Sequence, residues 1–256
     1  MQMSGKVAVI TGGASGLGEA TLRMLVDEGA QVAIFDVNEA RGKLLVEEFG
    51  ESVVFYSPTD VTNAAQVEQN VASVVQKFGR IDVLVSCAGI APPAKVLGKD
   101  GPMALEKFAT IVQVNLIGTF NVLRVVARVM QENAPNEDGE RGVIVNTASV
   151  AAFEGQIGQA AYAASKAGVV GMTLPIAREF ARDGIRMMAI APGLVETPMF
   201  NGLPDAAKAT LASSVPFPNR LGKPSEYAQL VKSIVENPML NGEVIRLDGA
   251  IRMAPK

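Results

Sequence analysis

Short runs of apolar residues, many of them β-branched, recur along the chain, and longer segments with a helical period separate them. Their hydrophobicity is continuous rather than alternating, which is typical of strands buried on both faces of a parallel sheet. We predict strands at residues 7–11, 31–36, 53–57, 83–86, 143–147, 187–191 and 244–247.

Segments with a helical period fill the gaps between these runs. We predict helices at about residues 17–28, 39–49, 64–78, 104–131, 158–182 and 225–236. Strands and helices alternate, which calls for right-handed crossover connections and a doubly wound α/β Rossmann fold with helices on both faces of the sheet. The 256 residues contain no internal repeat or long linker, so we expect a single domain spanning residues 1–256.

One segment, residues 194–217, interrupts this regular pattern. It contains Pro198, Pro204 and Pro216 and mixes apolar side chains with small polar ones. Its composition leaves two interpretations open: a mobile apolar cover over a substrate site, or an ordinary surface helix and loop.

The absence of histidine restricts the chemistry more than any other count. It excludes Ser-His-Asp hydrolysis, Cys-His nucleophiles and imidazole metal sites. A single cysteine, Cys87, excludes intrachain disulfides and cysteine-rich metal sites. We therefore predict no metal site, and any proton transfer must use Tyr, Lys, Asp, Glu or Cys.

Net charge and hydropathy narrow the range of partners. The formal net charge of −3 gives no basic footprint for nucleic acid or an anionic membrane. No uninterrupted apolar run approaches the roughly 18 residues that a membrane span needs. The strand pattern begins near Lys6 and leaves no room for a signal peptide. We expect no nucleic-acid or membrane partner, and a cytoplasmic location.

A glycine-rich turn follows the first predicted strand and opens the first helix. Gly12, Gly16 and Gly18 permit a tight turn, close approach of the backbone to a pyrophosphate, and tight helix packing. The second strand ends at Asp36, whose carboxylate suits a ribose diol and would repel a 2′-phosphate, which favours NAD over NADP. The alternatives are a plain turn for the glycines and, for Asp36, a helix cap ahead of Glu39.

Two further loops follow strand ends and are expected to line the same dinucleotide site as the glycine-rich turn, because ligands bind beyond the carboxyl ends of the strands in such sheets. Asp60-Val61 follows the third strand, and Cys87-Ala88-Gly89 follows the fourth. The alternatives are an ordinary turn residue at Asp60 and a buried small residue at Cys87.

Ser149, Tyr162 and Lys166 form the most specific set of candidate catalytic residues. Tyr162 and Lys166 share one face of a predicted helix, and Ser149 follows the fifth strand. A free phenol titrates near roughly pH 10, but an adjacent ammonium lowers its pKa. We predict that Tyr162 exchanges a proton with a substrate oxygen that Ser149 holds, while Lys166 lowers the pKa of Tyr162 and holds the nicotinamide ribose. The alternative is a half-buried tyrosine beside a solvated lysine.

These motifs together resemble the short-chain dehydrogenase/reductase family over essentially the whole chain. The resemblance is carried by segments 11–18, 60–61, 87–89, 162–166 and 192–193, with Asn115 and Ser149. It implies a seven-stranded parallel sheet in the order 3-2-1-4-5-6-7. It also implies that Asn115, otherwise a polar residue on a helix surface, shapes a helix and anchors a water relay to Lys166.

The same resemblance implies an extended set of cofactor contacts. Thr197 would contact the nicotinamide carboxamide and the pyrophosphate. The family has asparagine where this chain has Cys87, which puts an adenine-side hydrogen bond from this side chain in doubt. The implied NAD-binding residues are Gly12, Ser15, Gly16, Leu17, Gly18, Asp36, Asp60, Val61, Cys87, Ala88, Gly89, Tyr162, Lys166, Pro192, Gly193, Val195 and Thr197.

Longer runs at residues 146–156, 158–162, 216–218, 220–222 and 241–253 resemble the 3-hydroxyacyl-CoA dehydrogenases of that family. They imply NAD-dependent oxidation of an L-3-hydroxyacyl-CoA thioester to a 3-ketoacyl-CoA, and a homotetramer with C-terminal segments in its contacts. Gln159 and Leu203 are candidate substrate contacts beside Ser149 and Tyr162, although Gln159 also fits an exposed first helical turn. A hydroxysteroid or another secondary alcohol is the alternative substrate, and an NAD-bound scaffold without turnover is the alternative class.

Overall fold

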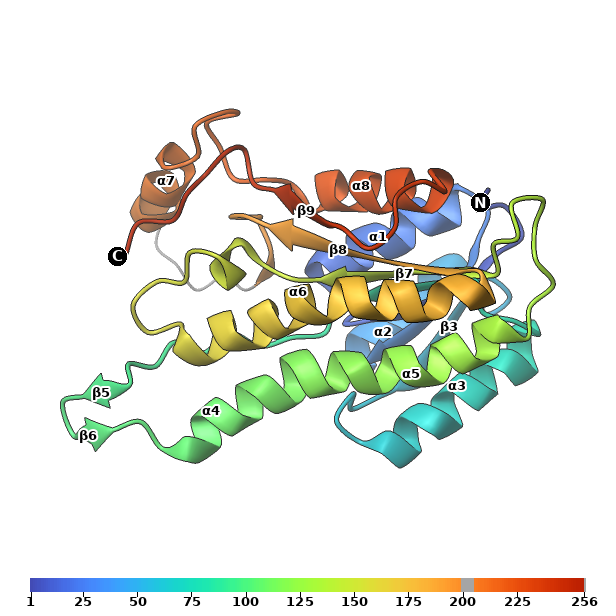
Figure 1. The fold of residues 1–256 in the computed structure, drawn as a ribbon, viewed down its shortest axis with the longest axis horizontal. Coiled ribbons are helices and arrows are strands. Elements are labelled where there is room, and N and C mark those ends of the chain that lie inside the picture. Colours follow the sequence, from blue (N-terminus) through green and yellow to red (C-terminus); the bar gives the residue numbers. More distant parts are fainter. Residues whose placement is uncertain (199–204, 256) are drawn as a thin grey trace.

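The computed structural model describes residues 1–198 and 205–255. Its main sheet is parallel and has the strand order β3-β2-β1-β4-β7-β8-β9 (Figure 1). Counted along the chain within this sheet, the order is 3-2-1-4-5-6-7, which confirms the predicted fold. The strands are β1 (Val7–Thr11), β2 (Gln31–Asp36), β3 (Val54–Pro58), β4 (Val83–Ser86), β7 (Gly142–Thr147), β8 (Ile185–Pro192) and β9 (Val244–Leu247).

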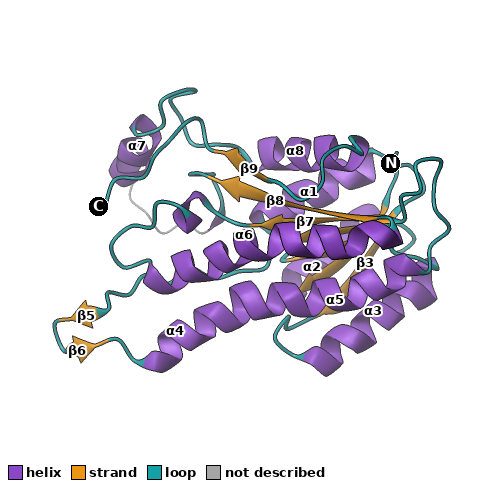
Figure 2. Cartoon of the chain, in the orientation of Figure 1, coloured by secondary structure: helices purple, strands orange, loops and turns teal. Residues whose placement is uncertain are grey.

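Helices cover both faces of the sheet (Figure 2). Alternate residues of each strand enter two separate cores, because successive side chains of a strand point to opposite faces. In β1, Ala8 and Ile10 belong to one core and Val7 and Val9 to the other. The first core is closed by α1 (Gly16–Asp27), α2 (Glu39–Phe49) and α8 (Pro224–Glu236), and the second by α3 (Ala64–Phe78), α5 (Thr119–Gln131) and α6 (Ala160–Phe180).

The helix predicted at residues 104–131 is interrupted in its middle. It consists of α4 (Leu105–Val112), a π-helical segment η1 (Gln113–Gly118) and α5. Such wide turns insert one residue into the α-helical pattern and are frequent at functional sites. By length and composition this run could cross a membrane, but 44% of its most apolar window is buried inside the protein and α5 packs on the sheet. The packing identifies α5 as a core helix of the fold.

Several elements were not predicted from the sequence. A small antiparallel hairpin, β5 (Leu97–Gly98) and β6 (Gly101–Pro102), precedes α4. Within residues 194–217 lies the helix α7 (Asp205–Ser213), and Val215 beyond it is buried. The candidate substrate contact Leu203 lies outside the described residues, so the interpretation of this segment as a cover stays a prediction. Short 3-10 helices η2 (Val150–Ala152) and η3 (Ala181–Asp183) flank α6.

Candidate active site

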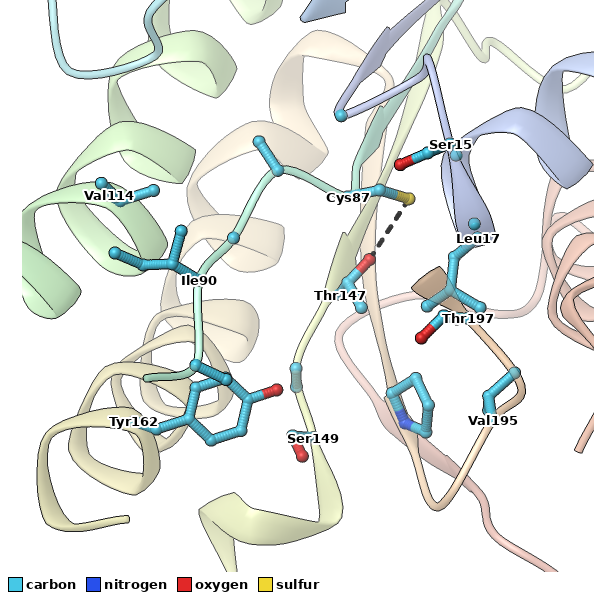
Figure 3. Close-up of a pocket in the computed structure, with 18 of the residues that line it drawn as sticks. Ser15, Leu17, Cys87, Ile90, Val114, Thr147, Ser149, Tyr162, Val195 and Thr197 are labelled. Atoms are coloured by element: carbon cyan, nitrogen blue, oxygen red, sulfur yellow. Dashed lines mark hydrogen bonds between the residues drawn. The ribbon is translucent and has the colours of Figure 1, made fainter. Parts of the chain in front are cut away.

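A cavity of about 570 Å³ opens at the carboxyl edge of the sheet (Figure 3). Strand carboxyl ends are where ligands bind in doubly wound folds. Most of the residues that the sequence singled out line this cavity, although they are spread over the first four-fifths of the chain. They are Gly12, Ser15, Gly16, Leu17, Gly18, Asp36, Asp60, Val61, Cys87, Ala88, Gly89, Ser149, Gln159, Tyr162, Pro192, Gly193, Val195 and Thr197.

The glycine-rich turn leaves no room for side chains. A Cβ at Gly18 would lie 2.2 Å from the carbonyl oxygen of Gly12, so the turn and the start of α1 are in direct backbone contact. Gly12 itself has φ +64°, and a Cβ there would lie 2.7 Å from the backbone nitrogen of Ala88. The N-terminus of α1 therefore faces the cavity with its amide groups open, which is a favourable site for a pyrophosphate. This geometry fits a dinucleotide and goes against a plain turn.

Asp36 joins the end of β2 to the glycine-rich turn. Its Oδ2 accepts a hydrogen bond from the backbone nitrogen of Ala14 at 3.0 Å, and its Oδ1 accepts from the backbone nitrogen of Asn38 at 2.9 Å. The cap of α2 is Asn38, which accepts from Arg41, so the helix-cap interpretation of Asp36 is wrong. A carboxylate has about four lone-pair sites, which leaves acceptor capacity for the hydroxyls of a ribose.

Arg23 of α1 and Arg41 of α2 are already paired with acidic residues. Arg41 binds Glu19 at 2.6 Å, and Arg23 binds both Glu19 and Glu48. A 2′-phosphate would meet the carboxylate of Asp36 and guanidinium groups that are engaged elsewhere. The local electrostatics thus fit a ribose better than a ribose phosphate.

Asp60 is both a turn residue and a cavity-lining residue, the two interpretations that the sequence left open. Its Oδ1 accepts hydrogen bonds from the backbone nitrogen and the hydroxyl of Thr62, at 2.9 and 2.8 Å, which makes it a turn residue. Asp60 also lines the cavity together with Val61. The neighbouring Val61 is fixed from behind, because its carbonyl accepts from Asn121 at 2.9 Å.

Cys87 belongs to a small polar network beneath the cavity. Its sulfur lies 3.5 Å from the hydroxyl of Thr147 and 3.7 Å from the hydroxyl of Tyr227 (Figure 3). The Thr147 and Tyr227 oxygens are 2.7 Å apart, and Tyr227 is fully buried. Burial raises the pKa of the Cys87 thiol, so it remains protonated at neutral pH. Within this network, Cys87 stands at the position where the family has asparagine.

Tyr162 and Lys166 lie one turn apart on α6. The Nζ of Lys166 is 5.9 Å from the centre of the Tyr162 ring and donates a hydrogen bond to the backbone oxygen of Thr147 at 2.7 Å. The lysine is buried, so the alternative of a solvated lysine is wrong. The Tyr162 hydroxyl points toward the strand end that carries Thr147 and Ser149 (Figure 3).

The pKa values differ from those predicted for this pair. Burial raises the pKa of Tyr162, and a hydrogen bond with Ser149 offsets this only in part. Burial also lowers the pKa of Lys166 from 10.5 to about 8. Desolvation dominates at both groups, so the pKa of Tyr162 lies above its usual value, and the predicted lowering of this pKa by Lys166 stays a prediction. A phenol with a raised pKa keeps its proton at neutral pH and suits the role of proton donor.

Asn115 acts from behind the cavity. Its Nδ2 donates to the backbone oxygen of Ile90 at 2.9 Å and to the hydroxyl of Ser165 at 3.0 Å, and its Oδ1 accepts from the backbone nitrogen of Ile90 at 2.8 Å. The side chain is fully buried in the π-helical segment, so the surface interpretation is wrong. Asn115 ties the loop after β4 to α6 next to Lys166. Its predicted role in a water relay stays a prediction.

Several residues at the site were not singled out from the sequence, among them Ile90, Thr147 and Met253. Ile90 is fixed by Asn115 and lines the cavity, the backbone of Thr147 holds Lys166, and Met253 lines the cavity from the far end of the chain. Ile90 binds Asn115 and Thr147 binds Lys166 through backbone atoms, which any residue type supplies, so no sequence signal marks these contacts. Met253 reaches the cavity through tertiary contacts that no local pattern encodes.

The comparisons with known proteins agree with this geometry. The model of the short chain dehydrogenase family matches residues 6–208. The chain therefore belongs to the short-chain dehydrogenase family, and it is an oxidoreductase for which that family implies a nicotinamide cofactor.

Individual relatives are similar over nearly their whole length. The chain is 57% identical over 255 residues to human 3-hydroxyacyl-CoA dehydrogenase type-2 and 56% identical over 255 residues to the Rattus norvegicus protein of that name, covering 99% of this chain and 97% of each relative. The crystal structure of 3-hydroxyacyl-CoA dehydrogenase type-2 from Mycobacterium avium superposes with a TM-score of 0.94 at 42% identity, covering 98% of both chains.

Proposed function

We propose that this protein interconverts a 3-hydroxyacyl-CoA and a 3-ketoacyl-CoA, with NAD as the hydride carrier. The observation that carries the reaction is that Ser149 and Tyr162 face the same cavity as the glycine-rich turn and Asp36. The substrate class is supported by the relatives, which are named as 3-hydroxyacyl-CoA dehydrogenases over nearly the full length of this chain.

Two side chains handle the substrate oxygen in this proposal. In reduction, the Tyr162 hydroxyl donates its proton to the oxygen of the carbonyl as the carbon receives a hydride. In oxidation, the Tyr162 phenolate takes the proton of the carbinol hydroxyl while the carbon loses a hydride. A bound nicotinamide dinucleotide supplies the hydride donor or acceptor. Ser149 holds the same oxygen by a hydrogen bond and so orients the reacting carbon.

Lys166 and Asn115 support this proton transfer without touching the substrate oxygen. Lys166 is fixed by the Thr147 carbonyl behind the Tyr162 ring, where its ammonium would favour the phenolate formed in reduction. Asn115 fixes the loop and helix that flank Lys166. Among the cavity residues, Ser15, Leu17, Gly89, Pro192, Gly193, Val195 and Thr197 are the proposed partners of the dinucleotide.

Replacing Asp36 by Ala should relax the preference for NAD over NADP. The carboxylate is the negative group nearest a bound ribose in this proposal, and a hydrogen bond to a charged group is worth about 1.5–3 kcal/mol. We expect the ratio of kcat/KM for NAD to that for NADP to fall by about tenfold to a hundredfold. Steady-state kinetics with both cofactors measures it, and Glu39→Ala, which removes an exposed carboxylate of α2, is the control. An unchanged ratio would remove Asp36 from the ribose site.

A substrate panel tests the proposed reaction. Purified protein and NAD are mixed with 3-hydroxyacyl-CoA thioesters, hydroxysteroids and simple secondary alcohols, and NADH formation is followed by its absorbance. Turnover of the thioesters supports the proposal. Turnover of steroids or simple alcohols alone would move the protein to the alternative substrate class, and no turnover in the whole panel would favour a non-catalytic scaffold.

We also propose that the protein assembles into a homotetramer. Leu105, Ile117 and Phe120 on the α4–α5 run are exposed apolar side chains, with 74%, 45% and 46% of their surfaces accessible. Exposed apolar surface of this kind is typical of protein interfaces. We expect sedimentation of a tetramer that dissociates when Phe120 is replaced by Glu, and a wild-type monomer at micromolar concentration would contradict this. The predicted cytoplasmic location stays a prediction.

A further inference from the structure

The last residues of the described chain return to the active-site cavity. After β9 the chain reverses direction, and Met253 lines the cavity together with Ser149 and Gln159. Residues 251–255 form neither helix nor strand, so tertiary contacts hold them in place. We refer to residues 248–255 as the C-terminal strap.

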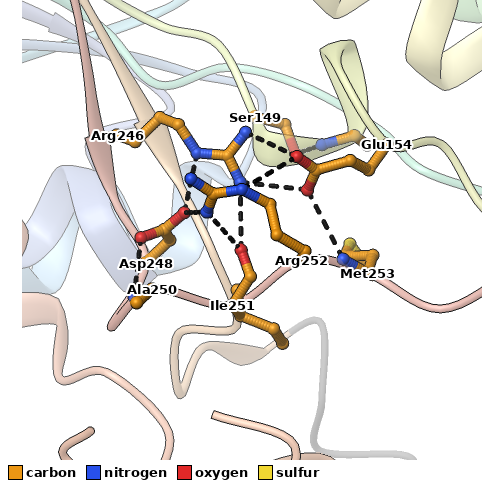
Figure 4. Close-up of polar contacts among 9 residues, drawn as sticks. Ser149, Glu154, Arg246, Asp248, Ala250, Ile251, Arg252 and Met253 are labelled. Carbon is orange, nitrogen blue, oxygen red and sulfur yellow. Dashed lines mark hydrogen bonds and ion pairs between the residues drawn. The ribbon is translucent and has the colours of Figure 1, made fainter. Parts of the chain in front are cut away.

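Two arginines, Arg246 and Arg252, join the strap to the loop that carries Ser149. Arg246 of β9 binds both carboxylate oxygens of Glu154, at 2.9 and 3.0 Å, and its Nε binds Asp248 at 2.7 Å (Figure 4). The same guanidinium donates to the backbone oxygen of Ile251 and lies 5.3 Å from the centre of the Phe153 ring. Glu154 lies two residues beyond the end of the η2 helix, which begins after Ser149. Arg252 of the strap also pairs with Glu154 at 3.4 Å and with Asp248 at 3.2 Å. The loop after Ser149 and the strap thus share a cluster of two arginines and two carboxylates.

Further hydrogen bonds to backbone atoms of the strap extend this connection. Glu154 accepts from the backbone nitrogen of Met253 at 3.4 Å. The side chain of Gln156 donates to the oxygen of Ala254 at 3.1 Å, and the nitrogen of Ile157 donates to the oxygen of Pro255 at 3.0 Å. The position of Met253 therefore depends on the loop between Ser149 and α6.

The reversal before Met253 is held in an unusual backbone conformation. Among the described residues, Ala250 is the one non-glycine residue with positive φ, at +66°. Its nitrogen donates to Oδ1 of Asp248 at 3.0 Å, whose other oxygen is bound by Arg246. A left-handed residue with a Cβ costs roughly 1–2 kcal/mol, so surrounding contacts must maintain it. The Arg246 cluster supplies such contacts and turns the strap toward the cavity.

The strap also contacts the other wall of the cavity. A Cβ at Gly193 would lie 2.9 Å from Asp248, and Ile251 is buried against the same turn. The nitrogen of Phe217 donates to the oxygen of Gly249 at 3.2 Å. The strap is therefore packed between the Ser149 loop and the segment that follows β8.

We propose that Met253 is a specificity-determining residue that limits the space for the acyl chain, and that Glu154 and Arg246 are the residues that position it. This inference rests on the proposed function. An unbranched thioether side chain adapts to an irregular apolar space, which suits contact with a methylene chain. The pair that holds it is shielded, with 23% and 21% of the Glu154 and Arg246 side chains exposed. Arg246 also lowers the pKa of Glu154, so the carboxylate stays ionised at neutral pH.

Met253→Ala tests the contact with the substrate. The smaller side chain opens the end of the cavity, so the ratio of kcat/KM for a long-chain to that for a short-chain 3-hydroxyacyl-CoA should rise by about tenfold. The kcat/KM for the short-chain thioester is the reference in this ratio, so a general loss of activity in the variant cancels out. A ratio equal to that of wild type would overturn the role of Met253.

Glu154→Gln tests the positioning. We expect amide hydrogen exchange in residues 250–254 to accelerate by about tenfold and the chain-length ratio to shift in the same direction as in Met253→Ala. In Met253→Ala itself, exchange should stay at the wild-type rate. Glu39→Gln, which removes an exposed ion pair with Lys43 on α2, is the matched control and should change neither quantity. Wild-type exchange and a wild-type ratio in Glu154→Gln would overturn the positioning role.

The experiment separates this inference from the proposed function. If wild-type protein oxidises hydroxysteroids or secondary alcohols but no thioester, the proposed substrate class is wrong. The same variants are then compared on a long and a short member of the accepted alcohols. A shifted ratio there supports the role of Met253, and an unshifted ratio overturns it.

Discussion

Tyr162→Phe should lower kcat by about 10²- to 10⁴-fold, the range that general acid–base catalysis contributes. The substitution removes the exchangeable proton and changes the volume of the side chain little. Because the hydroxyl faces the reacting end of the cavity rather than the glycine-rich turn, NAD affinity should stay within about twofold of wild type. Stopped assays of turnover and a calorimetric NAD titration measure the two quantities.

A comparison with Ser149→Ala sharpens the assignment of the proton donor. That variant keeps the phenol and loses only the second hydrogen bond to the substrate oxygen, so its kcat should fall less than that of Tyr162→Phe. If Tyr162→Phe keeps a kcat near that of wild type, another group must transfer the proton.

Lys166→Met should abolish most activity and yet stabilise the folded protein at neutral pH. Burial lowers the pKa of Lys166 from 10.5 to about 8, so the charged form is disfavoured in the folded state. One pKa unit corresponds to about 1.4 kcal/mol, and the shift from 10.5 to about 8 therefore costs about 3.5 kcal/mol at most. The hydrogen bond to the Thr147 carbonyl, worth about 1.5–3 kcal/mol, is lost in the variant, so we expect a net gain of about 0.5–2 kcal/mol in the free energy of unfolding.

The pH dependence of this effect has a defined sign. Between about pH 8 and 10.5 the folded wild-type protein binds fewer protons at this site than the unfolded chain. Its free energy of unfolding therefore rises with pH across this window, and the full cost is present below pH 8. Lys166→Met should lack that rise, as urea unfolding at several pH values would show. A variant less stable than wild type at pH 7 would contradict the cost assigned to the buried ammonium.

The strands were predictable because a parallel sheet imposes a strong pattern on the sequence. Strands buried on both faces read as continuous apolar runs, as in Val7–Thr11, and their ends in the structure differ by only a few residues. The π-helical segment at Gln113–Gly118 was not predictable, because one inserted residue barely changes an apolar helical pattern. The β5–β6 hairpin has strands of two residues, which are too short to show any period.

The candidate site was predictable where its chemistry depends on a side chain at a strand end. Asp36 and Ser149 stand beside the same cavity because parallel strands bring their carboxyl ends together. The pKa values were not predictable, since the burial of Tyr162 and Lys166 depends on packing from distant segments. The position of Met253 was hidden for the same reason, because an ion pair between β9 and the Ser149 loop sets it.

The end of β7 concentrates the reactive groups of this molecule. The Thr147 carbonyl holds the lysine and Ser149 lies two residues on, so a single strand terminus sets the spacing of the groups that act on the substrate oxygen. The hairpin before α4, the segment around α7 and the C-terminal strap lie on other parts of the chain. Substitutions in these three segments can therefore change the range of substrates while the groups that transfer the proton keep their arrangement.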